Sequence, residues 1–226
     1  MTYHWDFGFL LQLGPLLFQG LVNTVKLWAV ALVCGLAIGL VIGVFRTSPS
    51  RTLRVIGTFY VETIRNTPGL VQLIWIFYAL PILTGMQSSP WIAAVVSLSI
   101  YAGAYSAEIY RAGIASVELG QWEAAKALGF GFINQMRYVV LPQALTRMVP
   151  AFGNRAIELA KATTLASTIA FGELLHTAKT IAEDQYRPLE TYTALTLLFT
   201  AVLLPLSYAI IQLEKRLGKK GTLHRE

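Results

Sequence analysis

The sequence predicts an all-helical integral membrane protein with about five transmembrane helices. Of its 226 residues, 55% are hydrophobic and only 13% are charged, whereas about a quarter of the residues in soluble proteins are charged. The mean hydropathy is +0.56, and apolar stretches recur that reach the roughly 20 residues a helix needs to span a bilayer. The net charge of +6 comes without a basic stripe interleaved with exposed aromatic residues. Nucleic acid is therefore not expected as a partner, and the positive charge belongs at the membrane surface.

The N-terminal segment precedes the first predicted span. Residues 1–13 contain no Lys or Arg and no small-residue cleavage site, so they do not indicate a signal peptide. Trp and Tyr favour the headgroup zone of a bilayer, and we expect a short segment on the outer surface. Its aromatic residues are Tyr3, Trp5, Phe7 and Phe9.

The first span is predicted over residues 16–45. Gly35, Gly39 and Gly43 recur there every four residues and form a close-packing helix face. The sequence leaves open whether this face packs within its own bundle, which is the favoured interpretation, or against a second subunit. The lone Cys34 excludes an internal disulfide and is expected to serve packing.

Four further spans follow a polar turn that carries Arg46, Arg51 and Arg54. They are predicted over residues 55–80, 90–113, 145–171 and 192–213. The pair Pro68-Gly69 is expected to interrupt the second span and to free backbone groups for a ligand or a neighbouring helix. Five spans place the two termini on opposite sides, and residues 1–226 are predicted to form a single transmembrane domain.

The distribution of Lys and Arg predicts the orientation. Basic residues cluster in the turn after the first span, in the central loop and in the tail, which contains Lys215, Arg216, Lys219, Lys220 and Arg225. The opposite loops hold little beyond Lys179 and Arg187. Because positive charge marks the cytoplasmic side, the N-terminus is expected outside and the C-terminus in the cytoplasm. The external segment 173–190 is then either a surface helix that meets a binding protein or a simple connector.

The polar segment 113–142 lies between predicted spans and ends in Leu141-Pro142. Glu123-Ala124-Ala125 and the later Gly129 predict a short helix, a glycine stop and a second short helix. The alanines give the first helix a low profile, and Glu123 adds a charge that can orient it. Such a helix suits a groove on a soluble partner, although a generic amphipathic cytoplasmic loop is the alternative.

The full spacing of this segment resembles a known motif. Glu-Ala-Ala, three residues, Gly, nine residues, Val139, one residue and Leu-Pro is similar to the EAA loop of membrane subunits of bacterial ABC importers. Val139 stands where that family usually has isoleucine. The resemblance implies a type I importer permease fold, with a cytoplasmic coupling helix that docks on an ATPase subunit. The coupling residues it implies are Glu123, Ala124, Ala125, Gly129, Leu141 and Pro142.

Polar residues in the second and third predicted spans are candidates for a substrate path, because polar groups in lipid usually face a bundle interior or a cavity. The run Arg65-Asn66-Thr67-Pro68, with Gln72 after it, and the run around Tyr105 and Glu108 resemble permeases for polar amino acids. For Arg65 the favoured interpretation is a side chain that snorkels to the cytoplasmic surface. Glu108 either contacts substrate or pairs with Arg111 or with an arginine of another span.

The fourth predicted span holds the densest polar set, namely Asn154, Arg155, Glu158, Lys161, Thr163, Thr164 and Ser167. Three-residue steps let Arg155, Glu158 and Lys161 neutralise one another along one side of the helix, either as a structural network or as partners for a zwitterionic substrate. The run from Lys161 to Ser167 also resembles the polar amino-acid family near its translocation path. Thr164 replaces the more common serine, and Glu158 lies among positions that are more often neutral.

The sequence indicates no catalytic centre. His4, His176 and His224 lie far apart, and neither a metal-binding histidine pair nor a phosphate-binding loop with its lysine is found. We therefore expect no metal and no cofactor in the chain itself. The chain is not expected to be an enzyme, and its energy must come from a partner.

The resemblance to the histidine/glutamine permease family covers nearly the whole chain. It implies a bacterial inner-membrane permease that imports a polar or charged amino acid, in contact with membrane lipid. Its implied partners are a second permease, identical or paralogous, two ATP-binding subunits that hold ATP and Mg, and an external solute-binding protein. A secondary transporter or channel and a purely structural membrane protein are the alternatives. The sequence does not identify the amino acid.

Overall fold

The computed structural model describes residues 3–85 and 87–222, and this part of the chain is helical throughout with short connections. The elements in chain order are α1 (Gly8–Gln12), α2 (Gly14–Thr47), α3 (Arg51–Arg65), α4 (Gly69–Ile74), the π-helix η1 (Trp75–Ala79), α5 (Leu80–Thr84), α6 (Pro90–Ala115), α7 (Leu119–Ala127), α8 (Phe132–Asn134), the π-helix η2 (Gln135–Val140), α9 (Leu141–Ala162), the 3₁₀ helix η3 (Thr163–Ile169), α10 (Leu174–Gln185) and α11 (Pro188–Thr222). Of the predicted basic tail and histidines, Arg225 and His224 lie outside the described residues, as do the side chains of Arg216, Lys219 and Lys220.

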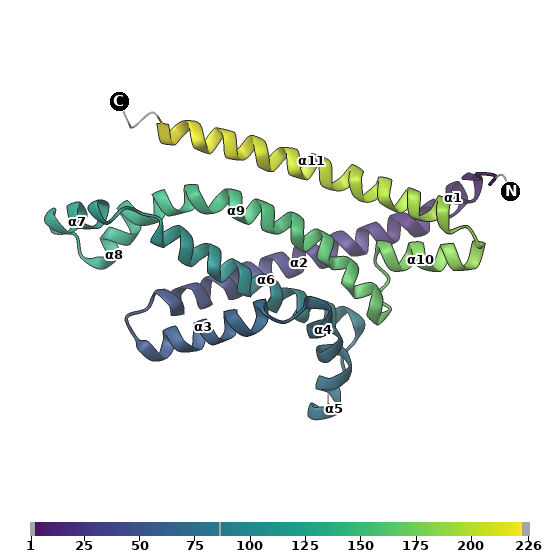
Figure 1. Cartoon of the computed structure of the whole chain (residues 1–226), viewed down its shortest axis with the longest axis horizontal. Coiled ribbons are helices and arrows are strands. Elements are labelled where there is room, and N and C mark those ends of the chain that lie inside the picture. The colour runs from purple at the N-terminus through teal and green to yellow at the C-terminus, as the bar shows by residue number, and fades with distance from the viewer. Residues whose placement is uncertain (1–2, 86, 223–226) are drawn as a thin grey trace.

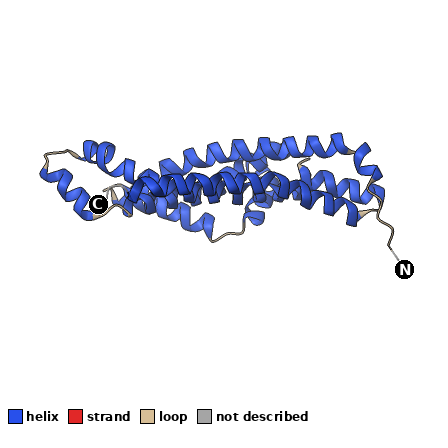
Figure 2. Ribbon diagram, turned by 90° about the horizontal axis from the view of Figure 1, so that it is seen from above, coloured by secondary structure: helices blue, strands red, loops and turns tan. Residues whose placement is uncertain are grey.

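The long helices run along one axis of an elongated bundle (Figures 1 and 2). In Figure 1, α7 and α8 lie at the same end as the C-terminus, whereas α1, α10 and the N-terminus lie at the other end. The first described residues and the C-terminal end of α11 therefore lie at opposite ends of the bundle.

Three helices of the described chain are long and apolar enough to cross a membrane, and a bent pair makes up to four. The three cover Gly14–Thr47, Pro90–Ala115 and Pro188–Lys215. The predicted second span is not one straight helix, because α3 and the following segment Gly69–Thr84 are bent by 102° at the predicted Pro68-Gly69 break. The predicted fourth span corresponds to α9 and η3. Its charged residues make α9 less apolar than the three helices named above, although it lies alongside them (Figure 1).

The glycine face of α2 packs against α6 in the same chain, which answers the question that the sequence left open. A methyl group added at Gly35 would lie 2.5 Å from Cβ of Ala102, and one added at Gly39 would lie 2.4 Å from Cβ of Ser106. Real Cβ atoms do not approach this closely, so the two backbones meet only because these positions lack side chains.

A buried cluster joins α2, α4, α6, α9 and η3 near the middle of the bundle. Its largest members are Leu27, Leu73, Leu98, Leu159 and Ile169, each 2% exposed or less. This apolar core fixes the positions of α6 and α9, whose polar faces form the cavity described below.

The N-terminal segment is fastened to the start of α11. The Tyr3 hydroxyl donates to the Glu190 carboxylate, and the Asp6 amide donates to the same group at 3.1 Å. Arg187 Nη1 donates to Glu190 at 3.0 Å and to the His4 carbonyl at 3.1 Å. Of the two alternatives for segment 173–190, the structure contains a helix, α10 (Leu174–Gln185).

Candidate functional site

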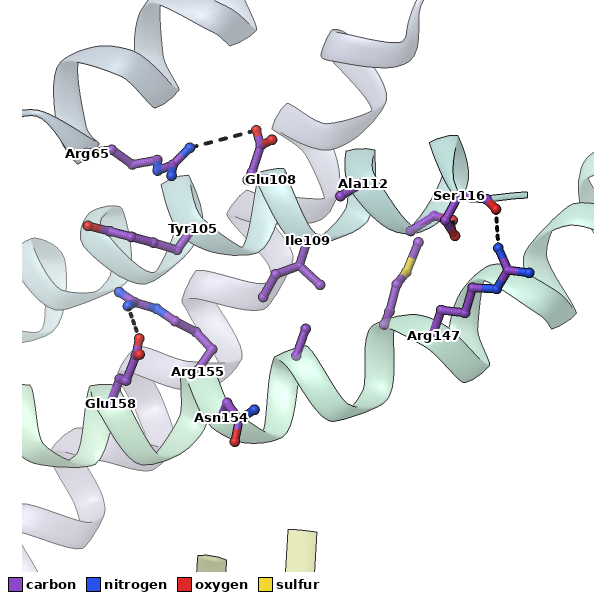
Figure 3. Close-up of a pocket in the computed structure, with 13 residues that line it drawn as sticks. Arg65, Tyr105, Glu108, Ile109, Ala112, Ser116, Arg147, Asn154, Arg155 and Glu158 are labelled. Atoms are coloured by element: carbon purple, nitrogen blue, oxygen red, sulfur yellow. Dashed lines mark hydrogen bonds and ion pairs between the residues drawn. The ribbon is translucent and has the colours of Figure 1, made fainter. Parts of the chain in front are cut away.

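A polar cavity of about 510 Å³ lies between the end of α3 and the facing sides of α6 and α9 (Figure 3). Its charged and hydrogen-bonding lining comprises Arg65, Tyr105, Glu108, Ser116, Arg147, Asn154, Arg155 and Glu158. The volume falls within the roughly 300–1,000 Å³ typical of small-molecule sites. Three of the predicted path residues, Tyr105, Glu108 and Glu158, therefore share one cavity.

Glu108 is surrounded by arginines from three helices. Arg111 Nε donates to its Oε1 at 3.2 Å, and Arg46 of α2 donates to its Oε2. Arg65 of α3 approaches the same Oε2 to 4.0 Å (Figure 3). The structural pairing expected for Glu108 is thus confirmed for Arg111 and for an arginine of another helix.

Arg65 turns into the bundle toward Glu108, and not away from it as a snorkelling side chain would. It is the last residue of α3, and the helix carries it away from the polar turn at Arg51 toward the middle of the bundle (Figure 1). There it lines the cavity, and its guanidinium carbon lies 5.3 Å from the ring centroid of Tyr105. The helix break after residue 65 leaves it at the cavity edge.

Arg155 is the most buried charged residue that lines the cavity, at 5% exposure. Its guanidinium carbon lies 3.8 Å from the ring centroid of Tyr105 and 4.5 Å from that of Tyr101. Nη1 donates to Glu158 Oε2 at 2.8 Å, whereas Nε and Nη2 are buried and have no hydrogen-bond partner among the described residues. Buried charged donors normally find acceptors, so Arg155 retains unused binding capacity.

Lys161 does not continue the predicted row of mutually neutralising charges. It lines a separate cavity of about 480 Å³ against α11, together with Thr164. Six residues of helix turn a side chain through about 240° relative to Arg155, because each residue adds about 100°. The expectation of one continuous charged side holds for Arg155 and Glu158 only.

The other predicted path residues lie apart from the polar cavity. Thr163 is fully buried and donates to the Ala160 carbonyl at 2.7 Å. Asn66 and Thr67 donate to carbonyls of the last turn of α3, at 2.8 Å in each case. Gln72 Nε2 donates hydrogen bonds to the carbonyls of Ile64 and Thr67. These side chains satisfy backbone groups at helix ends.

The predicted short helix, glycine stop and second helix are present as α7, Gly129, α8 and η2. Gly129 has a φ of +78°. The Phe130 amide donates to the Ala125 carbonyl at 3.1 Å, and the Gly129 amide donates to the Lys126 carbonyl at 3.0 Å. These are the two bonds of a Schellman cap.

The helix α7 presents part of the EAA sequence to solvent at one end of the bundle (Figure 1). Glu123 and Ala124 are exposed, whereas Ala125 is 2% exposed and faces the chain itself. Around them lie exposed apolar side chains of the same segment, namely Leu119, Leu128, Phe132 and Ile133, each at least 68% exposed. A concentration of exposed apolar residues of this kind is typical of a surface that contacts a protein or a membrane.

The residues after η2 anchor this end to the bundle. Leu141 and Pro142 begin α9, and the proline occupies a first-turn position that needs no amide donor. Beneath them, Val117, Val140 and Met148 form a buried cluster. The segment around α7 is therefore packed against the adjoining ends of α6 and α9.

Comparison with known proteins identifies the family. Residues 35–219 match the family described as "Binding-protein-dependent transport system inner membrane component". The chain belongs to this family.

Individual members resemble the chain over most of its length. It is 37% identical to the glutamine transport system permease protein GlnP of Escherichia coli K12, over 90% of this chain and 93% of that one. It is 34% identical to the arginine transport system permease protein ArtQ of Bacillus subtilis 168, over 94% and 97%. Binding-protein-dependent permeases are thus its relatives in sequence, and the membership predicted from the EAA spacing is confirmed.

Solved structures agree with the fold. One, described as an amino acid ABC transporter with histidines, superimposes with a TM-score of 0.90 at 36% identity, over 95% of this chain and 100% of that one. The MetNI methionine ABC transporter superimposes with a TM-score of 0.78 at 22% identity, over 91% and 98%. The predicted type I importer permease fold is confirmed.

Sequence reasoning missed one residue that lines the cavity and one that binds its Glu108 from outside the lining. Arg147 was not singled out, yet it lines the cavity and donates to the Ser116 carbonyl. Arg46 was assigned only to a turn, although it lies three residues after Gly43. Since residues three apart share a helix face, the glycine stripe already placed Arg46 toward α6 and hence toward Glu108.

Proposed function

We propose that this chain is the transmembrane permease subunit of an ABC importer that carries a polar or charged amino acid into the cytoplasm. The observation that carries the proposal is the exposed EAA helix, rigidly capped at Gly129 and placed at one end of a bundle that contains a polar cavity. An autonomous carrier has no need of such a dock. Relatives named for glutamine and arginine transport support an amino acid as the substrate.

The proposed complex contains two such permeases, identical or paralogous, and two ATP-binding subunits that hold ATP and Mg. The α7 end faces the cytoplasm and the ATPases, whereas the α10 end and the N-terminus face outward toward a solute-binding protein. This orientation rests on the Lys and Arg distribution. The permease itself supplies no ATPase site and no cofactor.

The proposed mechanism couples α7 to the cavity through the ends of α6 and α9. Closure of the ATPase dimer displaces α7, and the apolar cluster under it moves the two helix ends together. Two side-chain contacts link the same segments: Gln143 of α9 donates to Gln121 of α7 at 3.3 Å, and Arg147 of α9 donates to the Ser116 carbonyl. Because α6 and α9 also line the cavity, their movement changes the side from which it is open, as alternating access requires.

The experiment reconstitutes the chain with its ATPase and binding-protein subunits in liposomes and measures uptake of radiolabelled amino acids. Uptake is expected to require ATP and to be lost in Glu123→Arg, which reverses the exposed charge of the dock. Glu214→Arg is the matched control, because Glu214 is an exposed glutamate of α11 outside the coupling segment. Uptake driven by an ion gradient and insensitive to Glu123→Arg would instead support a secondary transporter.

A further inference from the structure

The polar cavity carries more positive than negative charge. Its lining contains the arginines Arg65, Arg147 and Arg155 and the carboxylates Glu108 and Glu158. Two more arginines, Arg46 and Arg111, bind Glu108 from outside the lining. Five arginines against two carboxylates leave a surplus of three positive charges. Charges inside a membrane bundle are costly unless they are compensated.

Arg65 directs unused donors into the cavity. Its Nη1 lies 4.0 Å from Glu108, which is an ion-pair distance and longer than a hydrogen bond. Its side chain is 38% exposed. A guanidinium in this position offers the planar donor pair that matches a carboxylate.

Arg155 is the second cationic partner. Figure 3 places Tyr105 between the guanidinium groups of Arg65 and Arg155, and both groups lie near its ring, at 5.3 and 3.8 Å from the centroid. Nε and Nη2 of Arg155 are buried and meet no hydrogen-bond acceptor within residues 3–85 and 87–222. Two cations beside one ring repel each other, so an anion bound beside them on the cavity side is favourable.

The cavity also offers acceptors for an ammonium group. Glu158 uses Oε2 for Arg155, and its side chain is 64% exposed. Asn154 lines the cavity beside it (Figure 3). An α-ammonium group can therefore be bound without displacing the Arg155–Glu158 pair.

We infer that this cavity is a substrate site that selects amino acids with two carboxylates over cationic amino acids, with Arg65 and Arg155 as the carboxylate partners. A dicarboxylic amino acid brings one net negative charge into a site with surplus positive charge, whereas a cationic side chain adds to the surplus. The inference rests on the proposed function, because it takes an amino acid as the molecule that crosses the cavity.

The test measures direct binding to the permease–ATPase complex in nanodiscs without the solute-binding protein, so that the selectivity belongs to the membrane subunits. Tritiated L-glutamate is compared with L-glutamine and L-arginine. We expect glutamate to bind at least about tenfold more tightly than arginine. Arg65→Gln is expected to weaken glutamate binding by about tenfold, since one hydrogen bond between charged groups contributes a factor of this size.

Two further variants separate the charge effect from folding. Arg51→Gln changes the same residue type at the other end of α3, away from the cavity, and should leave glutamate binding unchanged. Arg65→Lys keeps the charge and should retain part of the affinity that Arg65→Gln loses.

The inference is overturned if arginine binds as tightly as glutamate, if Arg65→Gln leaves glutamate binding unchanged, or if a transporting complex binds no amino acid. ATP-dependent uptake by the same preparation tests the proposed function separately. A complex that imports glutamine or arginine but does not prefer glutamate contradicts this inference alone. A complex without ATP-dependent uptake of any amino acid contradicts both.

Discussion

Glu108 holds together three helices whose arginines would otherwise repel one another. Its neutralisation by Arg46, Arg65 and Arg111 places one carboxylate against three guanidinium groups. We predict that Glu108→Gln lowers the free energy of unfolding by about 2–4 kcal/mol, because breaking a largely buried ion pair leaves uncompensated charge. Thermal unfolding in detergent checks this value.

Glu62→Gln is the control for Glu108→Gln, since Glu62 is an exposed carboxylate that accepts from Asn66 alone within the described chain. Its effect should stay within about 0.5 kcal/mol. Equal effects of the two substitutions would show that the arginine cluster does not depend on Glu108.

Glu173 is a fully buried carboxylate that caps α10, outside the predicted spans. Burial raises its pKa from 4.5 to about 7, against the lowering effect of the amides of Leu175 and His176. The folded state therefore holds its proton to higher pH than the unfolded state. The contribution of the protonated Glu173 to the free energy of unfolding is complete below about pH 4.5 and is lost as the pH rises through about 7.

Glu173→Gln removes this titration. The free energies of unfolding of the variant and the wild type are measured in detergent from pH 5 to pH 8. As the pH rises, the wild type should become less stable than the variant, by at most about 3 kcal/mol. Glu183→Gln, at an exposed position of the same helix, should follow the wild-type pH profile. A constant difference between Glu173→Gln and wild type across this range would contradict the prediction.

At the scale of single residues, the sequence predicted short-range partners better than long-range ones. The Glu108–Arg111 pair follows from helical spacing alone. The approach of Arg65 depends on where α3 ends and on the angle at which it meets α6, and neither is encoded in local spacing. The buried state of Arg155 depends likewise on two tyrosines of another helix.

Among the elements, the contact between α2 and α6 depends most on the absence of side chains. We predict that Gly39→Ala destabilises the protein by about 1–3 kcal/mol, because the new methyl group would lie 2.4 Å from Cβ of Ser106 and 3.0 Å from the Ala107 amide nitrogen. The unfolding midpoint in detergent measures the loss, which must exceed the gain of up to about 1 kcal/mol from better helix propensity.

Gly14→Ala is the matched control for Gly39→Ala. It lies in the same helix, and a methyl group there meets nothing within 4 Å. This substitution should be neutral or slightly stabilising. If Gly39→Ala behaved in the same way, α2 and α6 could separate without cost and the glycine stripe would have no packing role.

Local rules predicted the coupling segment and the helix break well. The glycine at 129 and the Pro68-Gly69 pair each impose a backbone geometry through their own chemistry. The 102° bend at the second site does not follow from these residues, because it is set by the packing of α4 against α6 and η3. The sequence therefore indicated where a helix stops and not the direction in which the chain continues.

For the whole molecule, α9 is the long helix of the bundle whose composition is least apolar. The helix α9 carries Arg147, Arg155, Glu158 and Lys161, which lower its apolar content although it lies beside the other long helices (Figure 1). The same charges build the cavities, so the helix least like a span by composition supplies much of the polar lining. Helical geometry separates the directions of Lys161 and Arg155, and the tertiary arrangement shows which cavity each of them lines.

The orientation of the whole molecule gives the last prediction. Lys126 of α7 and Lys179 of α10 are both exposed and lie at opposite ends of the bundle. In a Cys34→Ser background, Lys179→Cys should react with a membrane-impermeant maleimide in intact cells. Lys126→Cys should react only after the inner membrane has been permeabilised.

The cysteine-free Cys34→Ser protein controls for background labelling, and ATP-dependent uptake by each variant shows that the protein is folded. Labelling of Lys126→Cys alone in intact cells would reverse the proposed orientation and place the EAA helix outside, where no ATP-binding subunit could reach it. The two lysines thus test whether α7 lies on the cytoplasmic side. The coupling proposal requires this location, because the ATP-binding subunits can contact α7 only on the side of the membrane where ATP is available.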